Sequence, residues 1–233
     1  MILTSGIGKL LLLDLDGVLV TDGDGDTRIG CEIITVHQQL LKQLNSLRIP
    51  VAILTHRSRC EALQIIQALG LSRYDFHDIF TANDILVYGL RFKGICFLIN
   101  HGSKKSIILH FIQKHYNIPP RSVAFIDDRL CNVEDLINEG IGLGINVPAA
   151  KVIDGKKIVT FDFNSALETV KNWCEHSGLS NDSPILVQMP SVTIDLPVNA
   201  FSGSIIRRQW TDFFGLGRSG LRFSRQCILR LLK

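Results

Sequence analysis

The sequence lacks any apolar run near the roughly 18 residues that a membrane-spanning helix needs. It also lacks a basic N-terminal region followed by a long apolar stretch, and the short run Leu10–Leu13 leads directly into acidic residues. We therefore expect neither a transmembrane protein nor a secretory signal. The expected location is cytoplasmic, with peripheral attachment to a membrane as a further option.

Paired cysteine spacing is also absent, so the sequence indicates neither a disulfide framework nor a zinc motif. The six cysteines are scattered along the chain at Cys31, Cys60, Cys96, Cys131, Cys174 and Cys227. This pattern predicts buried, reduced thiols, as in a cytoplasmic protein. With 46% apolar and 20% charged residues, the composition is that of a globular protein and excludes a disordered chain, a collagen-like fibre and a coiled coil.

The net charge of +3 is unevenly distributed along the 233 residues. Residues 207–233 contain seven Lys or Arg and one acid, Asp212, which gives this segment +6 and leaves −3 on the remainder. Polar, turn-rich sequence at 177–184 separates the two parts. We predict a folded domain at residues 1–176, followed by a linker and basic amphipathic C-terminal extension at residues 177–233.

Short apolar runs alternate with helical patterns through the first 175 residues. This alternation predicts an α/β fold with a Rossmann-like parallel sheet and helices on both faces. Two further β-rich runs are compatible with a hairpin, at 85–88 and 95–99. The expected strands are 10–13, 51–54, 123–126, 141–145 and 158–161, and the expected helices are 36–47, 62–69, 106–116, 133–138 and 165–174.

The first predicted strand ends in two carboxylates, Asp14 and Asp16, followed by Gly17, which allows a sharp turn. The carboxyl ends of parallel strands line the ligand crevice of an open α/β sheet, so both carboxylates are expected there. A lone aspartate at such a position is commonly a cap for a turn or helix. Three more polar clusters lie at predicted strand or helix ends, and together they favour a functional site over a simple cap.

These three clusters occur in a fixed order along the chain. Thr55 ends the second predicted strand, where its hydroxyl either donates to a phosphate oxygen or lies next to a helix N-cap. A lysine opens a helix at Lys104 or Lys105, either as an anion ligand at the helix N-terminus or as a solvated surface pair. Asp127 and Asp128 follow an apolar strand directly. Carboxylates that converge in this way repel each other unless a cation binds among them, and Mg²⁺ is the expected guest.

The ordered set Asp-x-Asp-Gly (14–17), Thr55, Lys105 and Asp-Asp (127–128) resembles the signature motifs of the haloacid dehalogenase superfamily of phosphohydrolases. Each motif alone is weak, but the ordered set is specific and extends over residues 8–175. The carboxylate at Asp16 favours the phosphatases and phosphomutases of that superfamily over its dehalogenases and transport ATPases. About 38 residues separate Asp16 from Thr55, which leaves little room for a cap domain, so a capless or minimally capped member is expected.

The resemblance implies a role for each matching residue. Asp14 would be the nucleophile that becomes an aspartyl-phosphate, and Asp16 would act as general acid and base while its backbone carbonyl helps to hold the metal. Thr55 and Lys105, with Lys104 as the alternative lysine, would bind the phosphoryl oxygens. Asp127 and Asp128 would complete the Mg²⁺ site with Asp14.

We therefore expect a Mg²⁺-dependent phosphoric monoester hydrolase acting on a small molecule or on a macromolecule such as a phosphoprotein. Two alternatives stay open: a catalytically idle binding module with this fold, and a phosphotransferase to an acceptor other than water. The glycine-rich run at 140–144 lies in a predicted strand and opens no helix, so we do not interpret it as a dinucleotide site. The sequence does not define the oligomeric state.

The C-terminal segment 221–233 is amphipathic when placed on a helical wheel. One face carries Arg222, Arg225, Arg230 and Lys233, and the opposite face carries Phe223, Cys227, Ile228, Leu231 and Leu232. This pattern suits an anionic membrane surface or an acidic partner, and a helix docked on its own domain explains it equally well. Nucleic acid is a third option, although the segment contains no recognisable binding motif.

Overall fold

The structure is a computed structural model that describes residues 8–20, 47, 49–153, 157–176 and 183–195. Its larger sheet has six strands, and every neighbouring pair is parallel. In spatial order the strands are β3 (Ile79–Phe80), β2 (Val51–Leu54), β1 (Leu10–Leu13), β4 (Val123–Asp127), β5 (Leu143–Asn146) and β8 (Ile185–Gln188). A smaller antiparallel sheet contains β6 (Lys151–Ile153), β7 (Lys157–Phe161) and β9 (Ser191–Asp195).

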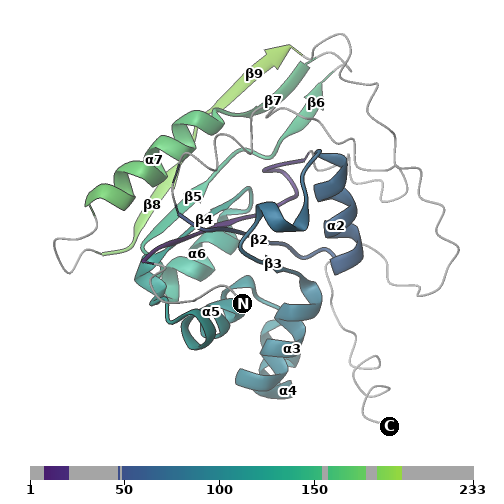
Figure 1. The fold of residues 1–233 in the computed structure, drawn as a ribbon, viewed down its shortest axis with the longest axis vertical. Coiled ribbons are helices and arrows are strands. Elements are labelled where there is room, and N and C mark those ends of the chain that lie inside the picture. Colours follow the sequence, from purple (N-terminus) through teal and green to yellow (C-terminus); the bar gives the residue numbers. More distant parts are fainter. Residues whose placement is uncertain (1–7, 21–46, 48, 154–156, 177–182, 196–233) are drawn as a thin grey trace, which may run out of the picture.

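Six α-helices lie in the described residues, and they pack on both faces of the larger sheet (Figure 1). They are α2 (Arg59–Ala68), α3 (Ala82–Phe92), α4 (Gly94–His101), α5 (Ile108–Tyr116), α6 (Leu130–Asn138) and α7 (Phe163–His176). Short 3₁₀ turns occur at η1 (Arg73–Asp75), η2 (Lys105–Ile107) and η3 (Pro120–Ser122). This arrangement is the expected Rossmann-like α/β fold.

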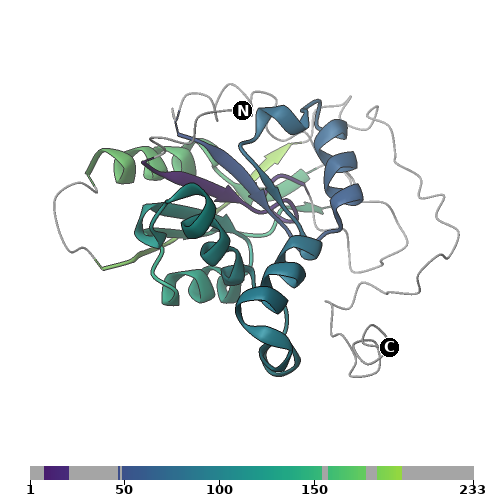
Figure 2. The ribbon, with the colours of Figure 1, turned by 60° about the horizontal axis from the view of Figure 1, so that its bottom comes forward.

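All four leucines of β1 are buried because successive side chains of a strand point to opposite faces, and both faces are covered. Leu11 and Leu13 belong to a core that includes residues of α2 and α7. Leu10 and Leu12 belong to a second core with residues of α3, α4, α5 and α6. Figure 2 shows the strands between these two layers of helices.

The strands expected at 10–13, 51–54, 123–126 and 141–145 all occur in the larger sheet, shifted by at most two residues. The helices expected from 62, 106, 133 and 165 onward are also present. The expected strand 158–161 forms as β7, but it pairs antiparallel in the smaller sheet and does not join the parallel one. The helix expected at 36–47 lies outside the described residues except for Leu47, which is buried.

The hairpin interpretation of 85–99 is wrong, because these residues form α3 and α4. The Asp84 carboxylate accepts hydrogen bonds from the Thr81 backbone N–H at 2.8 Å and from the Thr81 hydroxyl at 2.7 Å, which starts a helix. Buried residues then recur at Ala82, Ile85 and Gly89, which is helical spacing. Gly94, the first residue of α4, has a φ of +80°, which breaks the helical course of the chain after α3.

Two strands lie beyond the predicted domain boundary at residue 176. β8 pairs with β5 at the edge of the larger sheet, and β9 pairs with β7 in the smaller one. Residues 185–195 are therefore attached to the sheets of the domain. The boundary itself stays a prediction, and the basic segment 207–233 lies outside the described residues.

The expectation of buried thiols is wrong for three of the four cysteines that the structure describes. Cys60, Cys96 and Cys131 are exposed, and Cys174 is half-buried; all four are free thiols. Among the described residues, no helix combines the length and the apolar character needed to cross a bilayer.

Candidate active site

The predicted site residues meet at one edge of the larger sheet. Asp14 directly follows β1, Thr55 directly follows β2, and Asp127 is the last residue of β4. These three strands are neighbours in the order β2-β1-β4 and run parallel, so their carboxyl ends lie together. The sheet thus brings together polar residues that are far apart in the sequence.

Three carboxylates form a compact cluster at this edge. One oxygen from each of Asp14, Asp127 and Asp128 lies within 4.8 Å of the other two. Asp14 and Asp127 are buried, and Asp128 is half-buried. Like charges this close, in a site largely removed from water, require positive charge nearby.

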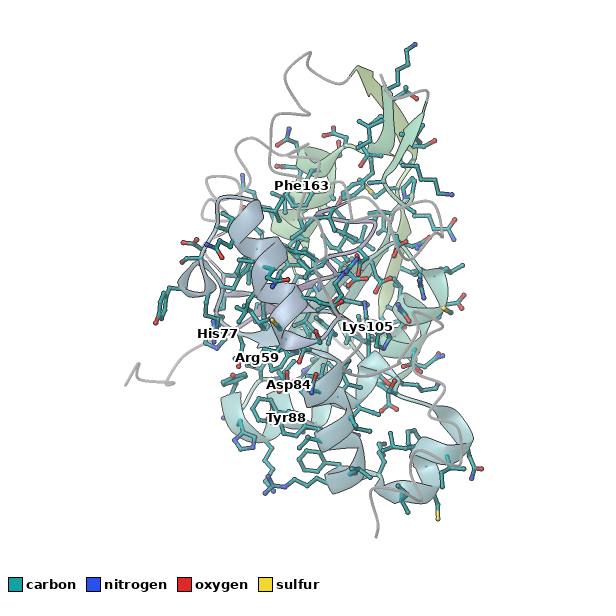
Figure 3. All side chains as sticks on the ribbon, turned by 90° about the vertical axis from the view of Figure 1, so that its right-hand side faces the viewer. Arg59, His77, Asp84, Tyr88, Lys105 and Phe163 are labelled. Carbon is teal, nitrogen blue, oxygen red and sulfur yellow. The ribbon has the colours of Figure 1, made fainter. Side chains whose placement is uncertain are left out.

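Lys105, the first residue of η2 and labelled in Figure 3, supplies positive charge to two of these carboxylates. Its Nζ lies 2.6 Å from Asp127 Oδ2 and 2.8 Å from Asp14 Oδ2, and its side chain is only 1% exposed. The ammonium group also lies 5.5 Å from the centre of the Phe125 ring. Lys105 therefore connects the carboxyl ends of β1 and β4.

The neighbouring Lys104 points elsewhere and pairs with Asp135 on α6 at 2.5 Å. Its side chain is partly exposed, in contrast to that of Lys105. Of the two lysines left open by the sequence, the structure brings Lys105 to the carboxylate cluster. Its role as a phosphate ligand stays a prediction.

Burial and neighbouring charges shift the pKa values of Asp14 and Lys105. Burial raises the pKa of the Asp14 carboxyl well above its ordinary value, opposed by Lys105 and reinforced by Asp127 and Asp16. Burial alone would lower the pKa of Lys105, but attraction to Asp14 and Asp127 outweighs it, so the pKa of Lys105 is raised. The lysine is therefore held as a cation between the two acids.

Asp127 is fixed by several donors in addition to Lys105. Its Oδ1 accepts the Arg129 backbone N–H at 2.7 Å, and Asn132 Nδ2 lies 3.1 and 3.0 Å from its two oxygens. From the end of β5, Asn146 Nδ2 donates to the main-chain oxygens of Asp127 at 3.2 Å and Asp128 at 3.1 Å. Both the side chain of Asp127 and the backbone of the acidic pair are thus held in place.

Asp16 lies beside the cluster, but its carboxylate pairs with Arg57. Arg57 Nε lies 2.9 and 2.8 Å from the two Asp16 oxygens, and Nη2 lies 2.5 Å from Oδ1. Arginine is suited to this two-pronged contact with a carboxylate. The predicted contribution of the Asp16 backbone carbonyl to a metal site stays a prediction.

Gly17 is required for two independent reasons. Its φ of +75° favours glycine, and a Cβ at this position would lie 2.5 Å from both Cγ and Oδ2 of Asp128. Its backbone N–H donates to Val20, and its carbonyl accepts from Ala150 at 2.9 Å. The absence of a side chain at Gly17 therefore lets the Asp128 carboxylate approach the first strand end.

Thr55 is wholly buried, and its Oγ1 accepts the Arg57 backbone N–H at 3.2 Å. The N-cap of α2 is Ser58, three residues further along the chain. The next residue, His56, has its Nε2 3.0 Å from the Ser103 carbonyl, which connects the loop after β2 to the loop before Lys105. Phosphate binding by Thr55 stays a prediction.

The chain matches no family model and no curated protein. Among solved structures it is similar to an HAD-superfamily hydrolase of subfamily IA from Geobacter sulfurreducens, at 14% identity and a TM-score of 0.39, covering 60% of this chain and 89% of that one. It is also similar to 3-deoxy-D-manno-octulosonate 8-phosphate phosphatase from Moraxella catarrhalis, a structure in complex with magnesium, phosphate and KDO, at 20% identity and a TM-score of 0.38, covering 61% and 70%.

A third similar structure is an uncharacterized protein from Corynebacterium glutamicum, at 16% identity and a TM-score of 0.43, covering 76% of this chain and 99% of that one. The structural neighbours thus include phosphatases and hydrolases of the haloacid dehalogenase superfamily, all at low sequence identity.

The donor set of the cluster fits a magnesium ion. Asp14, Asp127 and Asp128 offer hard carboxylate oxygens within 4.8 Å of one another, which Mg²⁺ prefers over nitrogen or sulfur ligands. Three carboxylates outnumber Lys105, the cation that contacts two of them. A divalent cation would add positive charge where these carboxylates converge.

Sequence reasoning missed three residues that shape this site: Arg57, Asn132 and Asn146. Asn146 ends β5, so the strand-end argument that singled out Asp14 would have found it as well. Asn132 lies on α6, five residues after Asp127, and no local pattern marks it. The contact of Arg57 with Asp16 depends on strand pairing between distant segments.

Proposed function

We propose that this chain is a Mg²⁺-dependent phosphatase that hydrolyses a phosphomonoester through an aspartyl-phosphate intermediate on Asp14. The observation that carries the proposal is the buried contact of Lys105 with both Asp14 and Asp127 at the carboxyl ends of adjacent strands. A buried nucleophile, a fixed cation and two further carboxylates at one sheet edge are the groups that phosphoryl transfer needs.

In the first step, a carboxylate oxygen of Asp14 forms a bond to phosphorus while the bond from phosphorus to the ester oxygen breaks. Asp14 Oδ1 accepts the Leu15 backbone N–H at 2.8 Å and Oδ2 lies against Lys105, so the carboxylate is oriented before substrate arrives. Lys105 and the Thr55 hydroxyl would stabilise negative charge on the phosphoryl oxygens.

Asp16 would give a proton to the departing ester oxygen and then take a proton from the water that attacks phosphorus. This water releases inorganic phosphate and restores the Asp14 carboxylate. In the structure Arg57 holds Asp16 by a two-pronged ion pair, so proton donation requires Asp16 to turn away from Arg57.

Asp14, Asp127 and Asp128 would hold Mg²⁺, with the Asp16 backbone carbonyl as a further ligand. When bound, the ion shields the negative charge of the carboxylate and phosphate as they approach each other. Lys105, Asn132 and Asn146 keep Asp127 and Asp128 oriented for this task.

The test is hydrolysis of p-nitrophenyl phosphate by the full chain with Mg²⁺, compared between wild type, Asp14→Asn and a control variant. An amide is a poor nucleophile of nearly the same shape, so we expect Asp14→Asn to lower kcat by more than about a hundredfold. The control is Glu134→Gln, which makes the same chemical change at an exposed position on α6. Retention of more than about a tenth of wild-type turnover by Asp14→Asn would contradict the nucleophile assignment.

We further propose a substrate whose phosphate is carried on a macromolecule such as a phosphoprotein, in the cytoplasm. The short separation of Asp16 and Thr55 leaves little room for a cap domain over the site, which supports a large substrate. The free thiols of the described cysteines support the cytoplasm. A screen of phosphopeptides, phosphorylated oligonucleotides and small phosphoesters decides the substrate class. Adding an alcohol as acceptor in the same assay separates hydrolysis from phosphotransfer.

A further inference from the structure

A long stretch in the middle of the chain contains no acidic side chain. Residues 85–126 hold no Asp or Glu, but they contain six Lys or Arg and three His. This stretch includes most of α3 and all of α4 and α5. Within it, Arg91 is exposed near the end of α3, and Lys93 is half-buried between α3 and α4.

Large apolar side chains are exposed on the same two helices. Val87 and Leu90 on α3 are 58% and 44% exposed, and Ile99 on α4 is 46% exposed. They are three of the six large hydrophobic residues that are exposed in the described part of the chain. Val87 and Leu90 are three residues apart on α3, so they lie on the same side of that helix.

The inner sides of these helices are already used for packing. Ile85 and Leu98 are buried in the core, and the Tyr88 ring stacks on Phe111 of α5 at 4.4 Å between centroids. At the contact between the helices, a Cβ on Gly89 would lie 2.7 Å from a methyl group of Leu98. Figures 1 and 2 show α3 and α4 projecting from the sheet, with Tyr88 labelled on this pair in Figure 3.

Cationic side chains lie close to the aromatic rings of Phe92 and Phe97 on α3 and α4. The Arg91 guanidinium and the Lys114 ammonium lie 5.8 and 5.7 Å from the centre of the Phe92 ring. Lys93 Nζ lies 5.7 Å from the centre of the Phe97 ring. Long cationic side chains beside apolar groups can extend to anions in water while their stems cover apolar surface.

We propose that the outer surface of α3 and α4 docks onto an anionic lipid bilayer. Val87, Leu90 and Ile99 would enter the boundary between headgroups and acyl chains, and Arg91, Lys93 and Lys114 would pair with lipid phosphates. Arg91, Lys93 and Lys114 match an anionic surface in charge, and the exposed aliphatic side chains select a bilayer over a nucleic acid, whose backbone would leave them in water. The proposal does not depend on the proposed phosphatase activity.

The test is co-sedimentation of the full chain with phosphatidylcholine vesicles that contain or lack phosphatidylserine. The two variants are Leu90→Asp and Arg91→Glu. Their matched controls are Tyr74→Asp in η1, where the side chain is 93% exposed, and Arg121→Glu, which is exposed in η3. Each control has the same change in net charge as its partner, and all proteins keep residues 207–233.

We expect wild type and both controls to bind phosphatidylserine vesicles equally, with little binding to phosphatidylcholine alone. Removing one cation near an anionic surface changes the partition by about fivefold, and we expect at least this loss for each of the two variants. Thermal unfolding followed by circular dichroism verifies that each variant is folded. If Leu90→Asp does not fold, Arg91→Glu alone decides.

Two results would overturn the proposal. One is equal vesicle binding by the variants and their controls, including the case in which none binds. The other is tight binding of wild type to a fluorescent oligonucleotide that both variants lose, since this would assign the surface to nucleic acid.

Discussion

Lys105 is the residue on which the candidate site depends most. A buried ammonium group is costly unless it is paired, and here two carboxylates pair with it. The arrangement is mutual, because Asp14 and Asp127 are themselves buried and have Lys105 as a shared cation. Removal of Lys105 leaves Asp14 and Asp127 close together without their shared cation, in a site largely removed from water.

We therefore expect Lys105→Met to lower the free energy of unfolding by about 3–5 kcal/mol at neutral pH. The matched control is Lys104→Met, whose partly exposed ion pair with Asp135 should contribute less than about 1 kcal/mol. Urea unfolding in the presence of a chelator measures both. Equal losses in the two variants would contradict the proposed difference between the lysines.

The loss in Lys105→Met should also depend on pH. Burial raises the pKa of Asp14 above its unfolded value, and removal of Lys105 raises it further. A carboxyl with a raised folded pKa binds more protons in the folded state, so stability falls as pH rises from about 4 through the folded pKa. Urea unfolding should thus show a smaller deficit at pH 5 than at pH 8.

At the scale of elements, the glycines of β5 and the turn before it have a packing role. A Cβ on Gly142 would lie 2.2 Å from the Arg121 backbone oxygen, and one on Gly144 would lie 2.6 Å from Val133 Cγ1 on α6. Both glycines let neighbouring segments approach closely. Packing therefore explains Gly142 and Gly144, and the backbone angle φ of +88° explains Gly140. No helix starts within this run, as a dinucleotide site would need.

We expect Gly142→Ala to lower the free energy of unfolding by about 2 kcal/mol or more, because the added methyl group meets a backbone atom that cannot turn aside. Gly8→Ala is the control, since within the part of the chain that the structure describes no atom lies within 4 Å of a Cβ at that position. Thermal or urea unfolding provides the comparison. A stability change in Gly142→Ala no larger than in Gly8→Ala would contradict the proposed contact.

The sequence predicted the central strands well because each is a short, wholly apolar run next to residues that favour turns, as at Leu10–Leu13. The same criterion failed for α3 and α4, since a short run rich in Ile, Leu and Val does not distinguish a strand from a buried helix. β8 was missed because its position depends on pairing with β5, about forty residues earlier. Flanking Pro184 and Pro190 favoured a loop instead.

At the scale of the whole molecule, metal binding should stabilise the fold. An ion bound only by the folded state raises stability, by about 2.7 kcal/mol at a concentration one hundred times its dissociation constant. We expect Mg²⁺ to raise Tm and to be needed for phosphatase activity, and we expect Asp127→Ala and Asp128→Ala to weaken both effects. Differential scanning fluorimetry across a Mg²⁺ titration is the measurement. An unchanged Tm, together with full activity after chelation, would contradict a Mg²⁺ site.

The basic segment 207–233 leads to a separate expectation. Its charge of +6 and the apolar face of 221–233 should strengthen binding to anionic vesicles in a salt-dependent way. Comparing the full chain with one that ends at Ser202 tests this by vesicle co-sedimentation. Equal partitioning of the two chains would favour a segment docked on its own domain.

The position of β1 in the larger sheet has a consequence for how the protein folds. β1 lies between β2 and β4, and its partner in β4 begins more than one hundred residues later in the chain. Closing so long a loop is slow compared with pairing of nearby segments. During synthesis, β1 can therefore pair with β4 only after most of the domain has been made. Asp14 meets Asp127 only at that late step, so recovery of activity during refolding should follow the slowest structural phase.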